Sequence, residues 1–252
     1  MMMNRTMPKP APVVLITGAA RRIGAAIAIR LHGCGYRVII HYQNSAADAE
    51  RLCSKLNAMR ADSAHSLQAN LLDIDSVEQL AKASITQWGQ LNALVNNASS
   101  FYPTPLPRAT NSQWDELIGS NLKGPFFLCQ ALSKELTKQC GSIVNISDIH
   151  AHQPLKDHSI YCIAKAGNKM LTKTLAKEFA PNVRVNGIAP GVILWPENDT
   201  QKNNGQEQLI KRIPLQRMGS SDDIARLAEF FITSASYITG QNIAVDGGKS
   251  LN

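Results

Sequence analysis

Residues 13–24 read VVLITGAARRIG and contain the pattern that decides the fold. The first four residues are apolar and mostly β-branched, which predicts a buried strand. Gly18 follows closely, and Ile23 begins a series of apolar residues at spacings of three and four, which predicts a helix. A glycine turn between a strand and a helix is typical of a site that binds phosphate at a helix N-terminus.

The same alternation of strands and helices continues to the end of the chain. Short apolar runs predict strands at residues 36–42, 63–69, 91–96, 142–146, 183–188 and 242–245. Helical spacing predicts helices at 46–59, with Ser45 as its N-cap, and at 76–88, 111–117, 121–138, 160–179 and 221–233. Such alternation predicts an α/β protein, a single-domain Rossmann fold whose doubly wound parallel sheet has helices on both faces. We expect residues 12–252 to form this domain and residues 1–11 to be a disordered lead-in.

One polar stretch interrupts the alternation. Residues 195–205, WPENDTQKNNG, are rich in turn-forming side chains and poor in apolar periodicity. We interpret them as a loop or lid within a longer substrate loop at about residues 192–214.

The composition argues against several classes of protein. Of 252 residues, 44% are hydrophobic and 18% are charged, which is normal for a folded, water-soluble domain. No apolar run is long enough to span a bilayer, the five cysteines form no C-x-x-C pair, and the first residues lack the apolar core of a secretion signal. We therefore expect a cytoplasmic protein without a membrane span, a disulfide framework or a metal site.

The chain carries more basic than acidic residues. Lys and Arg number 26 and Asp and Glu number 19, which gives a formal charge of +7. Because these side chains are scattered and form no basic run, the charge does not favour a nucleic-acid partner. It suits either a cleft for anionic small molecules or an ordinary solvated basic surface.

The candidate phosphate turn contains one unusual residue. Gly18 permits a tight turn, and Gly24 allows the helix to pack close to the sheet. Arg22 takes the place of the usual middle glycine, which restricts the backbone, but with Arg21 it can donate directed hydrogen bonds to phosphate oxygens. We expect this turn, with Ile23, to bind a dinucleotide; a turn without a ligand is the alternative.

The end of the second predicted strand indicates which dinucleotide binds. An acidic residue about 20 positions after the turn would bind the ribose hydroxyls of NAD. Here the strand ends without a carboxylate, in His41, Tyr42, Gln43, Asn44 and Ser45. These polar side chains, with Arg21 nearby, leave room for a 2′-phosphate and favour NADPH over NADH. A solvated turn is the alternative interpretation of the five residues.

Tyr161 and Lys165 are four residues apart near the start of a predicted helix, so they share one face. A nearby ammonium group favours the phenolate and would lower the pKa of the tyrosine from its ordinary value of about 10. Such a tyrosine suits proton transfer to a substrate atom while a hydride arrives on the neighbouring atom.

Several motifs together carry a resemblance to a known family. They are T-G-x-x-x-R-x-G at 17–24, Asn96-Asn97-Ala98, Asn121 in N-L-K-G, Tyr161 to Lys165, Arg184-Val185-Asn186, Pro190-Gly191 and Asp246-Gly247-Gly248. With these motifs the chain resembles the short-chain dehydrogenase/reductase family from Val13 to about Leu251.

The resemblance implies roles for individual residues. Tyr161 would donate the proton, Lys165 would hold the nicotinamide ribose and lower the tyrosine pKa, and Asn121 would position a water for proton relay. The cofactor cleft would also be lined by Asn70, Leu71, Asn97, Ala98, Ser99, Pro190, Gly191 and Ile193.

One departure from the family pattern bears on the substrate. The family usually has serine 13 positions before the tyrosine, whereas this chain has Asp148 there and Ser147 one place earlier. A carboxylate would repel a developing alkoxide, which argues against ketone reduction, and it suits a ring that presents N–H donors, such as a pterin. Asp148 as a simple helix cap is the alternative interpretation.

Asp148, Arg22 and the segment from Asn97 to Leu106 resemble the pteridine reductase branch of the family. By that resemblance Phe101 and the nicotinamide would sandwich a flat pterin ring. Ser99 would bind pterin or phosphate, and Arg22 would reach both. Trp195 either lines this pocket or anchors its loop, and Phe101 could instead be an ordinary core residue. His150, His152 and His158 fit solvated loops better than a metal site.

We therefore expect a cytosolic homotetramer that uses NADPH to reduce a C=N bond of a pterin, with dihydrofolate as a possible second substrate. The tetramer rests on the resemblance alone. Two alternatives remain open: a carbonyl reductase acting on 3-oxoacyl compounds, and an NADPH-sensing regulator without turnover. Asp148 argues against the first, and the intact set of Asn121, Tyr161 and Lys165 argues against the second.

Overall fold

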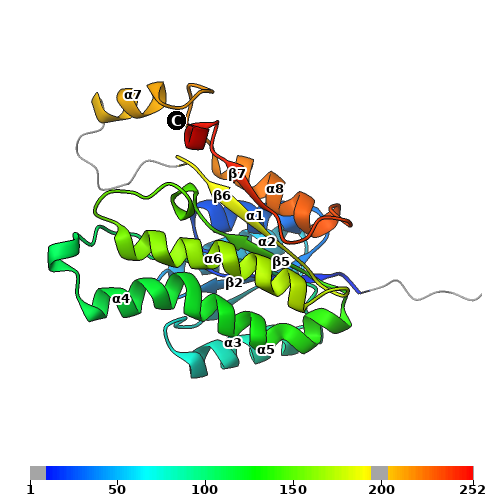
Figure 1. The fold of residues 1–252 in the computed structure, drawn as a ribbon. Helices are drawn as coiled ribbons and strands as arrows, with labels where there is room; N and C mark the ends of the chain where they lie inside the picture. Colours follow the sequence, from blue (N-terminus) through cyan, green and yellow to red (C-terminus); the bar gives the residue numbers. More distant parts are fainter. Residues whose placement is uncertain (1–9, 194–203, 252) are drawn as a thin grey trace, which may run out of the picture.

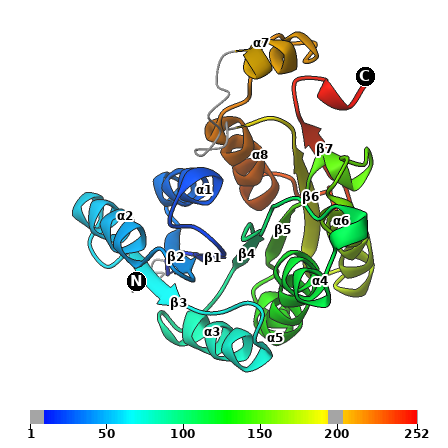
Figure 2. The same cartoon turned by 90° about the vertical axis from the view of Figure 1, so that its left-hand side faces the viewer.

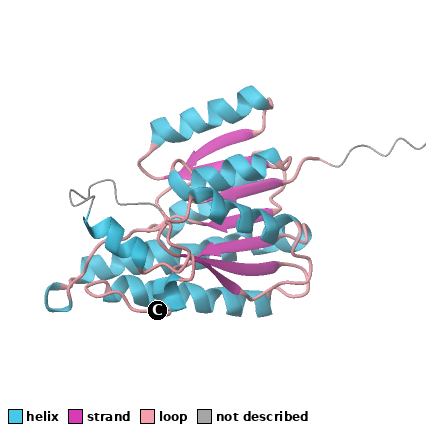
Figure 3. Ribbon diagram, turned by 90° about the horizontal axis from the view of Figure 1, so that it is seen from above, coloured by secondary structure: helices cyan, strands magenta, loops and turns pink. Residues whose placement is uncertain are grey.

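The structure is a computed structural model that describes residues 10–193 and 204–251. Its centre is a sheet of seven parallel strands in the order β3-β2-β1-β4-β5-β6-β7 (Figure 3). The strands are β1 (Val13–Ile16), β2 (Arg37–Tyr42), β3 (Ala64–Gln68), β4 (Ala93–Asn96), β5 (Ser142–Ile146), β6 (Arg184–Pro190) and β7 (Asn242–Val245).

Helices cover both faces of the sheet (Figures 1 and 2). One face is covered by α1 (Arg22–Gly33), α2 (Ala46–Met59) and α8 (Ser221–Thr233), and the other by α3 (Ile74–Thr86), α5 (Gly124–Lys138) and α6 (Ser159–Glu178). Outside these layers, α4 (Asn111–Ile118) packs against α6, and α7 (Asn204–Lys211) leads to α8. The α/β prediction of a doubly wound parallel sheet is confirmed.

The sheet is buried because its central strands are apolar on both faces. All four residues of β1, β4 and the apolar residues of β5 are buried, as expected for parallel strands covered on two sides. The edge strand β7 stays partly exposed. Two apolar clusters, one for each layer of helices, therefore hold the sheet between them.

The order of the strands reverses between β1 and β4, because the chain leaves β3 at one edge and returns to the centre. In sheets of this kind ligands bind at the carboxyl ends of the strands, at this reversal. The glycine turn after β1 and the asparagines at the end of β4 both lie there.

Most predicted boundaries agree with the structure within two or three residues, but three local features differ. Residues 119–123 form a π-helical turn, η2, before α5, so the helix predicted from residue 121 begins at Gly124. Ser45 stands at the N-cap position of α2, but its side chain makes no capping hydrogen bond. Residues 204 and 205 of the predicted loop begin α7, and the rest of that loop lies outside the described residues.

No helix in the described part of the chain has the length and apolar character needed to cross a membrane.

Candidate active site

The turn after β1 is closely packed around its two glycines. Gly18 has φ +61°, and a Cβ atom added there would lie 3.0 Å from the Cα of Ala98. A Cβ added at Gly24 would lie 2.4 Å from the carbonyl oxygen of Gly18 and 2.6 Å from Nδ2 of Asn97. The start of α1 therefore lies against the turn at a distance that only glycine permits at these two positions.

The start of α1 is suited to an anion. Arg21 is the N-cap residue but makes no side-chain cap among the described residues, and the first turn contains no acidic residue. The helices α3, α4 and α8 differ, because Asp73, Thr110 and Ser220 cap them. The first N–H groups of α1 and its positive dipole end thus remain available for a phosphate group.

Arg22 is the unusual residue of this turn. Its φ is +53°, in the left-handed region that glycine adopts easily and arginine does not. Its side chain is exposed and lines the cavity described below. The chain therefore places a cation at the phosphate turn at the expense of local backbone strain of about 1 kcal/mol or more.

The side chains of Thr17 and Asn97 fix the shape of the turn. The Thr17 hydroxyl oxygen accepts hydrogen bonds from the N–H groups of Asn97 (2.9 Å) and Ala98 (3.0 Å). The Asn97 amide donates to the carbonyl oxygens of Thr17 (2.8 Å) and Gly18 (3.0 Å). These bonds join the ends of β1 and β4 across the point where the strand order reverses, and the role of Thr17 is not evident from the sequence.

His41 supports the turn instead of offering a charge to the cofactor. Its side chain is 2% exposed; Nδ1 accepts a hydrogen bond from the Gly18 N–H (3.0 Å), and Nε2 lies 3.2 Å from the Ala69 carbonyl oxygen. Burial lowers the pKa of His41 to about 4. Because both ring nitrogens are engaged and the ring is neutral, His41 lines the cavity without adding a charge to it.

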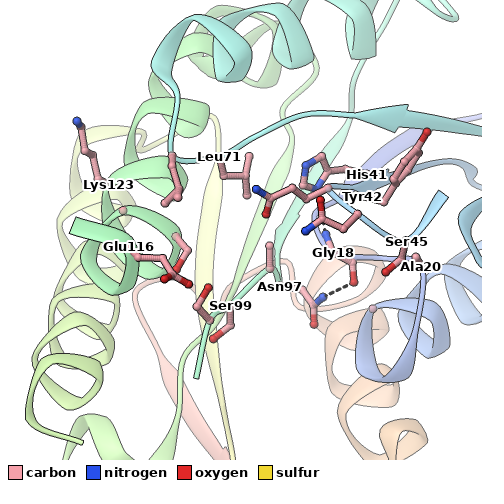
Figure 4. A pocket seen from close by; sticks show the side chains of 18 of the residues that line it. Gly18, Ala20, His41, Tyr42, Ser45, Leu71, Asn97, Ser99, Glu116 and Lys123 are labelled. Atoms are coloured by element: carbon pink, nitrogen blue, oxygen red, sulfur yellow. Dashed lines mark hydrogen bonds between the residues drawn. The ribbon is translucent and has the colours of Figure 1, made fainter. Parts of the chain in front are cut away.

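A cavity of about 1350 Å³ opens over the turn (Figure 4). This volume exceeds the roughly 300–1,000 Å³ typical of sites for small ligands and suits a long ligand such as a dinucleotide. Figure 4 shows His41, Tyr42 and Ser45 on one side and Glu116 and Lys123 on the other. The predicted residues that line the cavity are Gly18, Arg21, Arg22, Ile23, Gly24, His41, Tyr42, Gln43, Asn44, Ser45, Leu71, Asn97, Ala98 and Ser99.

Six predicted cofactor residues are not among those that line this cavity: Tyr161 and Lys165, which are described below, and Asn70, Pro190, Gly191 and Ile193. The Asn70 carbonyl oxygen Oδ1 accepts a hydrogen bond from Gln43 (3.1 Å) and so orders its neighbour. The Ile193 side chain belongs to the apolar core. Pro190 ends β6, and Gly191 lies so close to Asp246 that an added Cβ would be 2.5 Å from the Asp246 Cβ. The Ile193 side chain is therefore not available to a bound cofactor, whereas Asn70 is exposed.

A carboxylate from α2 pairs with Arg21 near the predicted 2′-phosphate end of the cavity. Arg21 donates a hydrogen bond to the Ser45 hydroxyl (2.6 Å), and its Nε lies 3.1 Å from Oδ2 of Asp48. The pentapeptide at the end of β2 lacks a carboxylate, but Asp48 partly balances the charge of Arg21. The sequence pattern misses Asp48 because it lies in the first turn of the following helix.

The carboxylate of Asp148 is fixed between two donors. One oxygen accepts a hydrogen bond from the Tyr161 hydroxyl at 2.6 Å, and the other accepts from the His150 N–H at 2.8 Å. Asp148 thus caps the short helix η3 (Ile149–Ala151) and also contacts the tyrosine. The two interpretations offered for this residue are compatible, because each uses a different oxygen.

The protonation of Tyr161 differs from the simple expectation. Tyr161 is 4% exposed, and its pKa is raised, first by burial and then by the charge of Asp148 and the hydrogen bond to it. The Y-x-x-x-K spacing predicts a pKa lowered by Lys165, and that prediction is wrong for the described chain without ligand. The phenol is therefore held protonated, as a proton donor.

Lys165 lies deep beside this pair. The whole residue is 2% exposed. Its Nζ donates a hydrogen bond to the Ile146 carbonyl oxygen (3.0 Å) and lies 5.7 Å from the centre of the Tyr161 ring. Burial lowers the pKa of Lys165 to about 8, and the charge of Asp148 opposes that shift. With this pKa the amine is mainly a charged ammonium at neutral pH.

Asn121 and Ser99 continue the polar cluster on the other side of Tyr161. The Ser99 hydroxyl donates to Oδ1 of Asn121 (2.6 Å). Ser99 also lies close enough to Tyr161 to oppose the rise in the pKa of the tyrosine. The Asn121 amide donates to the carbonyl oxygens of Leu117 (2.9 Å) and Ser100 (3.0 Å). Asn121 lies in the π-helical turn η2, a feature often found at functional sites.

Comparison with known proteins agrees with this geometry. Residues 18–250 match the family described as enoyl-(acyl carrier protein) reductase. Pteridine reductase 1 of Leishmania tarentolae is 37% identical over 98% of this chain and 99% of its own length. The 3-oxoacyl-(acyl-carrier-protein) reductase FabG of Staphylococcus aureus is 38% identical over 93% and 96%, and the corresponding reductase of Synechocystis is 37% identical over 94% and 96%.

The chain belongs to the short-chain dehydrogenase/reductase family. It is therefore an oxidoreductase with a nicotinamide cofactor, and the cavity over the α1 turn fits that cofactor. The similarity values are nearly equal for the pteridine reductase and the 3-oxoacyl reductases, so they do not distinguish between the two substrates.

In this short-chain dehydrogenase/reductase an aromatic group stands beside the proton donor. The Phe101 ring stacks on His158 with ring centres 4.8 Å apart and an angle of 15°, and its edge meets Tyr161 at 4.8 Å. Phe101 is exposed, so it is not an ordinary core residue. His158 is partly buried in this stack and His150 is also partly buried, whereas His152 is exposed.

The predictions for Trp195 and for a metal site remain. Trp195 lies outside the described residues. Among the residues that the structure describes, no group of three or more His, Cys, Asp and Glu side chains is arranged to hold a metal ion.

Proposed function

We propose that this oxidoreductase uses NADPH to reduce a C=N bond in the ring of a pterin, giving the tetrahydro form from a dihydropterin. The observation that carries the proposal is the 2.6 Å hydrogen bond between Tyr161 and Asp148, at the position where the family usually has serine. A carboxylate repels the alkoxide that develops in ketone reduction, and it attracts the N–H groups of a pterin.

NADPH would be held along the cavity over α1. Its pyrophosphate would lie at the uncapped N-terminus of α1 with Arg22, and its 2′-phosphate near Arg21 and Ser45. When bound, NADPH supplies the hydride that the ring carbon accepts.

Tyr161 would supply the proton to the neighbouring ring nitrogen, so that the C=N bond becomes CH–NH. Its raised pKa keeps the phenol protonated before the reaction, and Asp148 both orients the hydroxyl and accepts from the pterin. Lys165, with its pKa near 8, would compensate the negative charge left on the phenol.

The exposed face of Phe101 supports a flat aromatic substrate. Its stack with His158 and its edge contact with Tyr161 fix the ring next to the proton donor. A pterin could pack on this ring, with Ser99 and Arg22 at its polar edge. Dihydrofolate carries the same ring, so we include it as a second substrate.

The test is a steady-state assay of NADPH oxidation with biopterin-like, monapterin-like and folate substrates and with a keto ester. We expect turnover of at least one pterin, and a fall of about 10²- to 10⁴-fold in kcat for Asp148→Ser, because general acid–base catalysis contributes that much. Unchanged pterin turnover by Asp148→Ser would remove Asp148 from the mechanism and, with it, the argument for a pterin.

Reduction of a 3-oxoacyl compound is the second candidate, favoured by the identity of 37–38% with two 3-oxoacyl reductases. It predicts the opposite result in the same assay: turnover of the keto ester, no turnover of pterins, and a faster Asp148→Ser variant. Binding of NADPH without oxidation by any of these substrates would instead favour a regulator.

We also propose that the protein is a cytoplasmic homotetramer. Apolar side chains remain exposed on the outer helices, among them Ile163 (51%) and Met170 (57%) on α6 and Phe126 (42%) on α5. Their association with another copy would bury them. Light scattering of the purified protein would give the mass of the assembly.

A further inference from the structure

The π-helical turn that carries Asn121 is packed so closely that it has little freedom to move. A Cβ added at Gly119 would lie 2.6 Å from Cδ2 of Leu72, and one added at Gly124 would lie 2.6 Å from the carbonyl oxygen of Leu71. On the opposite side, a Cβ added at Gly167 of α6 would lie 2.6 Å from Cδ2 of Leu122. Three glycines thus bring the β3–α3 connection and α6 against the turn.

One polar side chain of α6 reaches the same turn. Asn168 is 2% exposed, and its Nδ2 donates a hydrogen bond to the Asn121 carbonyl oxygen at 3.1 Å. The donor is next to Gly167 in the sequence, so the close approach of the two backbones brings the amide within reach. In the described part of the chain this is the side-chain hydrogen bond that joins α6 directly to the Asn121 backbone.

The oxygen of the Asn168 amide, unlike its nitrogen, lacks a hydrogen-bond partner among the described residues. Oδ1 of Asn168 is buried and has no hydrogen-bond partner among the described residues. A buried amide oxygen without a donor is unfavourable by about 1–3 kcal/mol, and proteins usually satisfy such a group with a buried water. An apolar residue of similar size would avoid this penalty, so the amide needs a reason other than stability.

Asn168 also belongs to a longer buried polar network. Its carbonyl oxygen accepts from the Thr172 hydroxyl (3.2 Å), which accepts from the Asn145 amide (2.9 Å) in the centre of the sheet. Asn121 in turn accepts a hydrogen bond from the Ser99 hydroxyl (2.6 Å), and Ser99 lies close enough to Tyr161 to act on its pKa. The hydrogen-bonded network therefore runs from the core of the sheet to Ser99, beside the proton donor, and Asn168 connects its two parts.

We propose that Asn168 is a positioning residue for proton transfer: it fixes the Asn121 turn and holds a buried water at Oδ1, and through Asn121 and Ser99 it sets the orientation of the Tyr161 hydroxyl. The inference rests on the proposed role of Tyr161 as proton donor. It does not depend on whether the substrate is a pterin or a 3-oxoacyl compound.

The test compares Asn168→Leu with Ser84→Ala. Ser84 of α3 also has a buried oxygen without a partner among the described residues, but it is remote from the Asn121 turn, so its removal controls for the loss of a buried polar group. We expect Asn168→Leu to lower kcat at least about tenfold and to raise the solvent deuterium isotope effect on kcat, with the KM for NADPH changed less than twofold. Ser84→Ala should leave all three values unchanged.

A residue with a purely structural role would lower the melting temperature of Asn168→Leu and leave kcat and its isotope effect, measured well below that temperature, as in the wild type. That result would overturn the inference. If Asn168→Leu does not fold, Asn168→Ser replaces it: serine keeps a donor and leaves room for water, and we expect a kcat between those of wild type and of an Asn121→Ala variant. A kcat equal to the wild type would again overturn the inference.

The wild-type assay separates this inference from the proposed function. Absence of pterin turnover by the wild type contradicts the proposed function, and the comparison of variants is then made on the keto ester.

Discussion

Arg22→Gly should make the protein more stable and bind NADPH more weakly. A residue other than glycine at φ +53° has about 1–2 kcal/mol of backbone strain, which the substitution removes. Glycine also makes the unfolded chain more flexible, and this stabilisation of the unfolded state reduces the gain by about 0.4–1 kcal/mol. The net gain is about 0.5–1 kcal/mol. For a domain of this size, 1 kcal/mol moves Tm by about 2–4 °C, so we expect a rise of about 1–4 °C.

The same substitution removes a guanidinium from the phosphate turn. A hydrogen bond to a charged group contributes about 1.5–3 kcal/mol, which corresponds to a Kd for NADPH raised about 10- to 150-fold. Differential scanning calorimetry without ligand and a fluorescence titration with NADPH measure the two effects separately.

Cys140→Gly is the matched control. Cys140 also has a positive φ, +48°, but lies in the turn after α5, away from the cavity. It should show the rise in Tm without the change in Kd. A lower Tm for Arg22→Gly would refute the strain argument, and an unchanged Kd would refute the assignment of Arg22 to the phosphate.

Two further predictions concern His41, which supports the phosphate turn, and Asp48, which pairs with Arg21. Because the pKa of His41 is lowered from 6.5 to about 4 in the folded protein, the unfolded state binds more protons between pH 4 and 6.5. The free energy of unfolding should therefore fall by about 3 kcal/mol as the pH falls from 6.5 to 4. In a series of urea denaturations over this pH range, His41→Asn should show a smaller dependence on pH. Parallel profiles for the two proteins would contradict this account. Asp48→Asn removes the carboxylate paired with Arg21, so the Kd for NADPH should fall by up to about fivefold while the Kd for NADH stays the same. Titration with each cofactor at low salt measures the two constants. Equal changes in both would show that Asp48 does not act on the 2′-phosphate.

The sequence pattern predicts the fold well because its signals are local. Apolar runs and helix caps give β5, α2, α8 and β7 with the boundaries that the structure has. The glycine turn and the Y-x-x-x-K spacing likewise predict the site at the correct edge of the sheet, where the strands have their carboxyl ends. Such signals need only a few neighbouring residues.

The parts of the site that the sequence pattern does not predict depend on contacts between distant segments. His41 is polar and looks exposed at the end of a strand, but burial against Ala69 and Gly18 makes it a neutral support. The Tyr161 pKa is raised, first because the side chain is buried and then because Asp148, 13 residues away in sequence, accepts a hydrogen bond from the hydroxyl at 2.6 Å. The Y-x-x-x-K spacing reveals neither the burial nor the carboxylate.

The reversal of strand order also divides the site along the chain. Residues that shape the phosphate turn lie between Thr17 and Ala98, whereas the residues around the proton donor lie between Ser99 and Lys165. The first stretch ends at β4, and the second begins directly after it. The hydrogen bonds that shape the phosphate turn are therefore made by other residues than those around the proton donor, so mutations around the proton donor can change the choice of substrate without altering the turn.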